Sequence, residues 1–311
     1  MTPSTLPAFA SFGEALTDLI RSGPTAWQAA CGGAGWNVAR AMSCLGVPSA
    51  FAGAISADVF GDALWDASQA SGLDLRFLQR RDKSPLLAVV SETHPPRYFF
   101  IGDDSADLYF DASELPADWR SAVRYAHFGG ISLAREPLAS RLLVVAEDLK
   151  AAGTRISYDP NFRVLMDERY DVVFERMCRL ADVIKVSDED LQGLFRHPDC
   201  QAGLDRIRAW NPRALILLTR GAEGAQLIST DQAVSALPPP VAIVDTVGAG
   251  DASLAGLIRS LMHSPDAPLG EHLRMAVGAG AAACTVAGAN LPSAAEVQAL
   301  AAQVLAVKVL L

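Results

Sequence analysis

A glycine-rich turn between two carboxylates is the stretch of this sequence best suited to chemistry. Residues 245–251 read DTVGAGD, and they lie between an apolar run at 241–244 and a run of helical character at 252–261. We predict a short buried strand, a turn and a helix. Such a turn directs several backbone N–H groups at one point beside a helix N-terminus, where an anion, and above all a phosphate, can bind.

Asp251 closes this turn, and a carboxylate beside an anion site requires a chemical reason. A general base supplies one, because Asp251 would accept the proton of a hydroxyl that attacks a bound phosphoryl group. The backbone N–H groups of Ala249, Gly250 and Asp251 would stabilise the charge that develops during transfer. Partly hydrated Mg²⁺ would bridge the phosphates of a nucleotide. The alternative is a tight turn that Asp251 merely caps.

A second glycine-rich segment lies at residues 31–40, CGGAGWNVAR, just before a predicted helix at 36–45. Its glycines allow a ligand to approach the backbone closely. A dinucleotide fingerprint does not fit, because Val38 occupies the position of the third glycine. Asn37 can satisfy backbone groups or face a polyhydroxy ligand. Asp18, among apolar neighbours at residues 15–20, is either exposed on a strand edge or placed for a ligand.

These residues need a scaffold, and the pattern of apolar runs indicates one in which strands alternate with helices. The predicted strands lie at residues 9–12, 50–55, 125–128, 155–158, 182–186 and 215–218. The predicted helices lie at residues 61–71, 137–152, 168–181, 189–195, 204–210, 252–262, 269–286 and 293–309. Such alternation implies a parallel sheet covered on both faces.

Ligands of parallel sheets bind beyond the carboxyl ends of the strands. Several polar residues follow predicted strands at that edge: Asp159, Asn161, Lys185, Ser187, Thr219, Arg220 and Gly221. One cleft could therefore collect them together with the turn at 245–251. Two β-like runs at 86–91 and 97–101 flank a proline-containing turn and predict a hairpin. With residues 15–30 they would form a small separate sheet, which we interpret as a lid.

Composition narrows the class of protein. The chain has 311 residues, of which 50% are hydrophobic and 20% charged, so it can bury a large core. Its formal net charge of −9 argues against a nucleic-acid partner. Residues 276–289 are apolar but rich in Ala and Gly. At that length we predict a buried helix rather than a membrane span, and no membrane partner.

The five cysteines are odd in number and lack CxxC spacing, so neither a disulfide framework nor a zinc site is indicated. Reduced thiols fit a cytosol. Residues 1–10 lack the basic start and long apolar core of a signal peptide. We therefore predict a cytoplasmic location. The absence of a GxxxxGK[ST] loop excludes a Walker-type nucleotidase.

The chain resembles the ribokinase-like (PfkB) family of carbohydrate kinases nearly from end to end, and most of all its bacterial fructokinases. Residues 245–251 match the family's DTxGAGD motif, and residues 32–39, GGAGWNVA, resemble its N-terminal glycine-rich motif. The resemblance implies an α/β fold, a three-layer sandwich with a mainly parallel central sheet and a small β-sheet lid. It implies a single kinase domain over residues 1–311, with a discontinuous lid at about 15–31 and 86–106.

The resemblance also implies roles for groups of residues. Asp251 matches the catalytic base, and the anion hole matches Gly248, Ala249 and Gly250. Sugar hydroxyls would bind to Asp18, Gly32, Gly33, Asn37, Arg163 and Asp251. ATP would bind to Ser187, Thr219, Gly221, Gly224, Gly248 and Gly250. A monovalent cation, K⁺ in many relatives, would lie near Asp245, Val247 and Gly288. Relatives often dimerise through the lid, which implies a homodimer.

The sequence departs from the family pattern at two places. The NxxE motif, which organises Mg²⁺ and phosphate in relatives, reads SDED here, with Ser187 and the shorter Asp190 at its ends. Asp190 would contact Mg²⁺ through water, in a shell that differs from that of relatives. In the first glycine motif, Gly35 and Trp36 replace a proline and a small residue. Trp36 either narrows the sugar pocket or packs under the lid, and we favour packing.

Residues 13–18, GEALTD, and 159–163, DPNFR, look most like fructokinases. The implied reaction transfers the γ-phosphoryl group of ATP to a primary hydroxyl of a hexose, from fructose to fructose 6-phosphate. The alternatives are a 2-keto-3-deoxygluconate kinase or another sugar or nucleoside kinase of the family. An acid sugar requires an arginine, for which Arg163 is a candidate. Gly102 replaces a lid arginine of relatives and favours a neutral sugar. A non-catalytic sugar or nucleotide sensor is the hypothesis of a different class, and an intact Asp251 argues against it.

Overall fold

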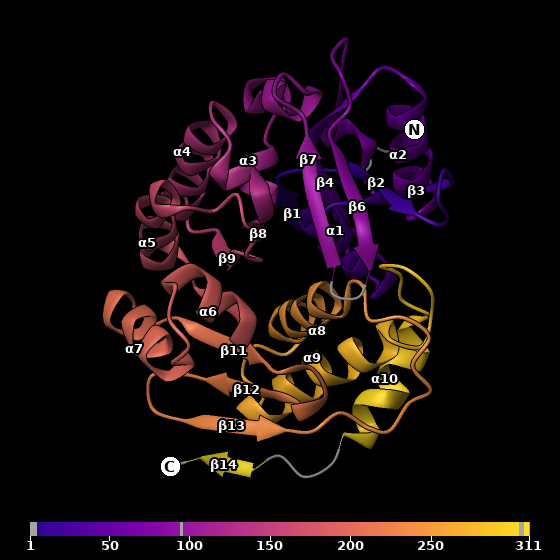
Figure 1. Ribbon diagram of the computed structural model, residues 1–311. Helices are drawn as coiled ribbons and strands as arrows, with labels where there is room; N and C mark the ends of the chain where they lie inside the picture. Colours follow the sequence, from indigo (N-terminus) through magenta and orange to yellow (C-terminus); the bar gives the residue numbers. More distant parts are fainter. Residues whose placement is uncertain (1–4, 94–95, 305–307, 311) are drawn as a thin grey trace.

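A long, mainly parallel sheet runs through the molecule (Figure 1). The structure is a computed structural model that describes residues 5–93, 96–304 and 308–310. Within these residues the sheet has ten strands in the order β14-β13-β12-β11-β10-β9-β8-β1-β4-β5. Their bounds are β1 (Phe9–Phe12), β4 (Ser49–Ser56), β5 (Leu78–Arg81), β8 (Tyr125–Gly129), β9 (Arg155–Asp159), β10 (Val183–Ser187), β11 (Leu215–Thr219), β12 (Ala225–Ile228), β13 (Ala233–Ala236) and β14 (Lys308–Leu310).

Neighbouring strands from β5 to β11 pair in parallel, and those from β11 to β14 pair antiparallel. Every residue of β1 and β4 is buried. Strands buried on both faces read as continuous apolar runs, which is why their positions could be predicted from the sequence. Because the parallel strands share one direction, their carboxyl ends meet at one edge of the sheet, where Asp159, Ser187 and Thr219 lie.

Helices cover both faces of the sheet. Their bounds are α1 (Ala34–Cys44), α2 (Val59–Ala70), α3 (Trp119–Ala122), α4 (Leu138–Ala151), α5 (Asp171–Leu180), α6 (Asp188–Phe195), α7 (Cys200–Trp210), α8 (Ala249–His263), α9 (Leu269–Ala283) and α10 (Ala294–Gln303). Apolar residues of α4 to α7 join one core cluster, and those of α1, α2 and α8 to α10 join a second. The predicted three-layer α/β architecture is therefore confirmed.

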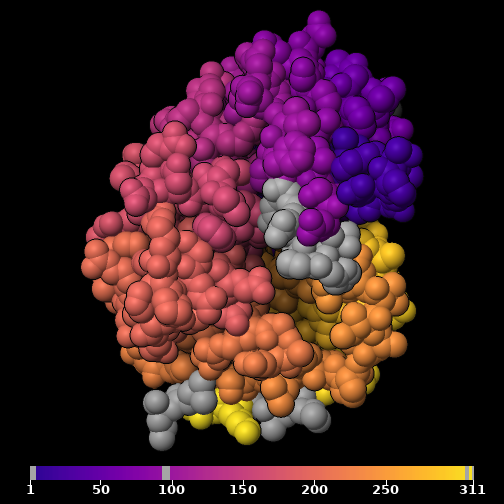
Figure 2. Space-filling view, in the orientation of Figure 1, coloured from indigo at the N-terminus to yellow at the C-terminus, as the bar shows by residue number. Residues whose placement is uncertain are grey.

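A separate four-stranded sheet, in the order β3-β2-β6-β7, lies beside the main one (Figure 1). Its strands are β2 (Leu16–Arg21), β3 (Trp27–Gly32), β6 (Leu87–Thr93) and β7 (Pro96–Ile101). β6 and β7 pair antiparallel, as the predicted hairpin requires, and the turn at 94–95 lies outside the described residues. In the space-filling view, the chain coloured indigo to magenta forms the upper part of the visible face and the orange segments the lower part (Figure 2).

Two predictions of the C-terminal part were wrong. Residues 241–244 form no strand, and the side chains of Ile243 and Val244 are 68% and 62% exposed. The position next to β13 is taken by β14, so the apolar run finds no partner strand there. The predicted helix at 293–309 ends at Gln303, residues 308–310 belong to β14, and residues 305–307 lie outside the described residues.

Two further helix boundaries differ from the predictions. Helix α8 begins at Ala249 rather than at residue 252, because Gly248 adopts the left-handed φ of 78° and caps the helix directly after the turn. Helix α9 ends at Ala283 rather than at residue 286. The early start of α8 matters for the site, since it places Gly250 and Asp251 in the first helical turn.

Candidate active site

Asp251 lies in the first turn of α8 and is 8% exposed. The first N–H groups of a helix have no partner within the helix. Ala249 uses its N–H on the Thr246 carbonyl at 3.3 Å. The N–H groups of Gly250 and Asp251 have no acceptor among the described residues. The turn thus presents two unsatisfied donors at a helix N-terminus, which is the arrangement that binds an anion.

Asn37 holds the Asp251 carboxylate through a hydrogen bond of 2.9 Å, from its Nδ2 to Oδ2. The two residues come from the first turns of α1 and α8, which pack side by side. Burial raises the pKa of Asp251 to about 7, and the nearby Asp159 carboxylate raises it as well. The Asn37 hydrogen bond, Lys185 and Arg163 act in the opposite direction. A carboxylate with a pKa near neutrality is suited to proton transfer at physiological pH.

Lys185, in the middle of β10, places its ammonium group directly behind the turn. A Cβ atom added to Gly250 would lie 3.2 Å from the Lys185 Nζ, so the glycine lets the lysine approach the backbone. The same Nζ lies 3.1 Å from Asp159 Oδ2 and 3.6 Å from Asp190 Oδ2, all three side chains being buried. These carboxylates raise the pKa of Lys185 despite its burial, so the ammonium stays charged.

The predicted sugar-binding residues meet at the base of the small sheet. A Cβ on Gly32 would lie 2.2 Å from Asp18 Oδ2, so only glycine leaves room for this carboxylate. Gly33 has a φ of 117°, and a Cβ there would lie 2.5 Å from the Glu14 carbonyl oxygen. Burial raises the pKa of Asp18 to about 6, against the opposing charge of Arg163. The Arg163 charge acts on Asp18 and Asp251 alike, so the structure brings these residues together.

The predicted nucleotide-binding residues lie at the ends of neighbouring strands. Ser187 on β10 is the register partner of Thr219 on β11. Gly221 and Gly224 follow with φ values of 50° and 88°, which permit the tight turn between β11 and β12. A Cβ on Gly224 would lie 2.1 Å from the Ala236 carbonyl oxygen. This turn, like Gly248 and Gly250, lies at the edge of the sheet where the parallel strands have their carboxyl ends.

Asp190 and Asp245 use their carboxylates on backbone groups. Asp190 accepts from the N–H groups of Phe162 and Ser187, each at 2.8 Å, and forms the capping box of α6 with Ser187. Asp245 Oδ2 accepts from the Gly288 N–H at 2.9 Å, so these two residues are neighbours. The described residues contain no group of three or more His, Cys, Asp or Glu side chains able to hold a metal ion.

Two residues of the site have no role in the sequence prediction. Lys185 is predicted only as a polar residue at a strand end, although a lysine inside the apolar strand VIKVS is itself a signal of a buried ion pair. Arg40 has no predicted role. Trp36 is 1% exposed and donates to the Ser68 hydroxyl of α2 at 2.9 Å, so it packs in the core and does not narrow the site.

The fold and the two glycine motifs define the class of protein. Residues 9–296 match the pfkB family of carbohydrate kinases, and the chain belongs to this family. It is 35% identical to a fructokinase of Klebsiella pneumoniae over 288 residues, 89% of this chain and 93% of that one. It is 31% identical to a fructokinase of Salmonella typhimurium over 89% of this chain and 93% of that one.

Solved structures agree with these relatives. Fructokinase of Xylella fastidiosa with bound ATP has a TM-score of 0.86 at 28% identity, covering 95% of this chain and 98% of that one. Fructokinase of Vibrio cholerae O395 with fructose, ADP and calcium bound has a TM-score of 0.82 at 28% identity, covering 94% and 98%. No helix in the described residues combines the length and apolar character needed to cross a membrane.

Proposed function

We propose that the protein transfers the γ-phosphoryl group of ATP to a primary hydroxyl of fructose and forms fructose 6-phosphate. One observation carries the proposal: a buried aspartate, Asp251, directly follows a helix N-terminus with unsatisfied N–H donors and is held by Asn37. The fructokinase relatives with bound fructose, ADP or ATP support this choice of substrates.

The residues at this edge of the sheet form two groups, one for the sugar and one for the phosphoryl group. The sugar would be held by Asp18, Gly32, Gly33, Asn37 and Arg163, and its reacting hydroxyl would lie at Asp251. Asp251 would take the hydroxyl proton while the oxygen attacks the γ-phosphorus of ATP, the bond to the bridging oxygen breaks and ADP leaves. The Gly250 and Asp251 N–H groups, with Gly248 and Ala249 shaping the turn, would stabilise the charge on the transferred group. The ammonium of Lys185, behind the turn, would add to that field.

Other residues at the strand ends would bind ATP and the metal ions. The nucleotide would be contacted by Ser187, Thr219, Gly221 and Gly224. Mg²⁺, when bound, would neutralise the phosphates while keeping most of its water. Asp190 would contact Mg²⁺ through water, because the N–H groups of Phe162 and Ser187 and the Lys185 ammonium already lie against its oxygens. The loop held by Asp245, with Val247 and Gly288, would bind K⁺.

A panel of acceptors tests this function. ATP consumption is measured with fructose, 2-keto-3-deoxygluconate, ribose, adenosine and fructose 6-phosphate, each over a range of concentrations. We expect the highest kcat/KM for fructose. A preference for the keto acid would replace fructokinase by the runner-up activity within the same family. The absence of ATP consumption with every acceptor would leave the sensor hypothesis.

We also propose a cytoplasmic homodimer that assembles through the small sheet, which would close over the sugar as a lid. Trp27 and Phe99 are 47% and 56% exposed on β3 and β7, the two edge strands of this sheet. An exposed edge strand is a place where another chain can pair. Light scattering after chromatography is expected to give twice the mass of the 32.9 kDa chain. The double variant Trp27→Ser, Phe99→Ser should give the monomer mass, and a monomeric wild type would contradict the proposal.

A further inference from the structure

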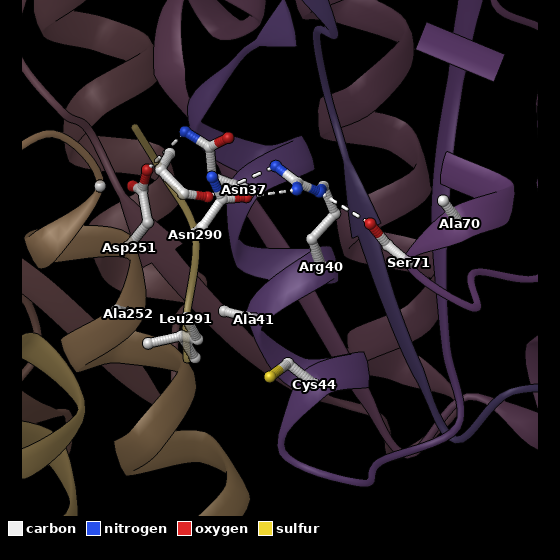
Figure 3. A pocket seen from close by; sticks show the side chains of 12 residues that line it. Asn37, Arg40, Ala41, Cys44, Ala70, Ser71, Asp251, Ala252, Asn290 and Leu291 are labelled. Atoms are coloured by element: carbon white, nitrogen blue, oxygen red, sulfur yellow. Dashed lines mark hydrogen bonds between the residues drawn. The ribbon is translucent and has the colours of Figure 1, made fainter. Parts of the chain in front are cut away.

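A pocket of about 280 Å³ adjoins Asp251 on the side of α1 (Figure 3). It lies between α1, the beginning of α8, the end of α2 and residues 289–291. Of the residues predicted to bind the sugar, Asn37 and Asp251 line it, whereas Asp18 and Arg163 do not. The pocket is therefore a second compartment, which shares the catalytic carboxylate with the first.

Arg40 provides the positive charge of this pocket. Its guanidinium stacks on the Trp36 ring, 4.3 Å from the ring centroid. It donates from Nε to the Ser71 hydroxyl at 2.9 Å and from Nη2 to Asn290 Oδ1 at 2.6 Å. A longer bond of 3.4 Å runs from Nη1 to the Ala289 carbonyl. Each of these acceptors is neutral, and no described carboxylate lies within ion-pair distance of Arg40.

A half-buried guanidinium without a counter-ion is unusual, because taking a charge out of water is costly unless an opposite charge compensates. Desolvation is the main influence on Arg40, and it lowers the pKa of this residue. The three bonds leave one N–H on each terminal nitrogen for another acceptor. A guanidinium N–H is a strong, charge-assisted donor to a carboxylate or a phosphate.

Asn37 supplies a second unsatisfied group at the inner end of the pocket. Its Nδ2 is engaged by Asp251, while its buried Oδ1 has no hydrogen-bond partner among the described residues. A hydroxyl is the donor that would satisfy it. Asn37 and Arg40 are three residues apart on α1, so their Cβ atoms are about 5–6 Å apart, a span that a six-carbon sugar can bridge. Figure 3 shows Asp251, Asn37 and Arg40 in a row along this edge of the pocket.

We propose that Arg40 is an anion subsite and that this pocket binds polyhydroxy compounds that carry a carboxylate or a phosphate. A hydroxyl of the ligand lies at Asn37 and Asp251, and the anionic group lies at Arg40. The inference deepens the proposed function, because it gives the enzyme a second class of ligand, acidic sugars, that competes for Asp251 with the neutral sugar. Such a compound is phosphorylated when its hydroxyl is placed correctly, and otherwise it inhibits.

The test compares Arg40→Leu, Arg40→Lys and the wild type with three probes. Fructose 1-phosphate carries the phosphate, 2-keto-3-deoxygluconate carries the carboxylate, and inorganic phosphate is the free oxyanion. Each is measured as an acceptor and as a competitor of fructose, and binding without ATP is followed by calorimetry. Arg40→Leu should weaken both sugar acids by about tenfold or more, since a hydrogen bond to a charged group is lost. Arg40→Lys should recover part of the affinity, and the KM for fructose should change less than about threefold.

Arg259→Leu is the matched control. Arg259 lies on α8, is half-buried and donates to the Leu45 carbonyl, but does not line the pocket. The Arg259→Leu substitution removes the same charge and should leave the affinity for both sugar acids unchanged. Arg40→Gln, which keeps polar contacts to Ser71 and Asn290 without the charge, replaces Arg40→Leu if that variant does not fold.

Three results would overturn the subsite. Unchanged affinity for both sugar acids in the Arg40 variants would show that Arg40 only ties α1 to its neighbours, and equal losses for fructose and the acids would show the same. Binding of inorganic phosphate as tight as that of fructose 1-phosphate would exclude a polyhydroxy ligand. A wild type that binds the acids through Arg40 but does not phosphorylate fructose would refute the proposed function and leave the subsite standing.

Discussion

Asp251 and Asp190 are two buried aspartates in the first turns of two helices, and they differ in how many donors they receive. Asp190 accepts two backbone N–H groups, and its own N–H is bonded to Ser187 Oγ. Asp251 accepts one hydrogen bond, from Asn37. Burial pushes the pKa of both upward, yet the Lys185 charge and these donors bring that of Asp190 below its usual value, whereas that of Asp251 reaches about 7. A buried carboxylate with its donors complete is structural, and one with few donors retains the capacity to take a proton.

The N-termini of α6 and α8 also differ in how many of their N–H groups have a partner. The N-terminus of α6 is closed by the capping box of Ser187 and Asp190. That of α8 follows Gly248, which provides no side chain to cap it, so the N–H groups of Gly250 and Asp251 stay open to a ligand. Lys185 lies between the two regions and connects them electrostatically.

The largest effect is expected for Asp251→Asn. The amide keeps the shape of the side chain and its contact with Asn37 but cannot take a proton. We expect kcat to fall by about 10²–10⁴-fold, the range of general-base contributions, while fructose binding measured by calorimetry changes little. The exposed Asp266→Asn removes the same charge and should have normal activity. Near-normal turnover in the Asp251 variant would refute its assignment as the base.

Asp190→Ala should act on stability. It removes the capping box and leaves the partly buried N–H groups of Phe162 and Ser187 without their acceptor. A lost cap costs about 0.5–2 kcal/mol and a buried unsatisfied group about 1–3 kcal/mol, so we expect a loss of about 2–4 kcal/mol. The free energy of unfolding is measured with urea, and the dependence of that free energy on urea concentration should be the same in the wild type and the variant. A change below about 0.5 kcal/mol would mean that Asp190 does not have the structural role assigned here.

Asp251→Asn should have the opposite effect on stability, and the effect should depend on pH. The folded-state pKa of Asp251, about 7, lies above the ordinary value of 3.8. The wild type therefore loses stability as the pH rises from about 3.8 to about 7, because in this range the group ionises in the unfolded chain but stays protonated in the fold. The asparagine has no such loss. We expect the variant to exceed the wild type in thermal midpoint by more at pH 8 than at pH 5, and a difference independent of pH would contradict the raised pKa.

The strands and helices could be predicted from the sequence more completely than the contacts between the residues of the site. Strands such as β4 and β10 were recognisable because parallel strands buried on both faces are continuous apolar runs. The same signal was wrong at residues 241–244, since an apolar run does not show whether a partner strand is available. Gly248 and Asp251 were identified from their motif. The contact of Asn37 with Asp251 spans 214 residues and depends on how α1 packs on α8, which no local pattern encodes.

Lys185 and Asp159 offer the finest test of the comparison between the two aspartates. Lys185 lowers the pKa of Asp251, and Asp159 raises it. In the wild type, kcat should rise with pH through about 7 as Asp251 becomes ionised. Lys185→Met should move that midpoint to higher pH and Asp159→Asn to lower pH, each by up to about one pH unit, or about 1.4 kcal/mol. The measurement is kcat from pH 5 to 9 at saturating fructose and ATP.

Opposite shifts in the two variants would separate charge from structure, because a merely disturbed fold lowers kcat at every pH without moving the midpoint in a direction set by the sign of the charge. Lys185→Arg is the control that keeps the positive charge, and it should retain the midpoint of the wild type even where the larger guanidinium crowds Gly250 and lowers kcat. Shifts of the same sign in Lys185→Met and Asp159→Asn would show that the charges behind the turn do not set the basicity of Asp251.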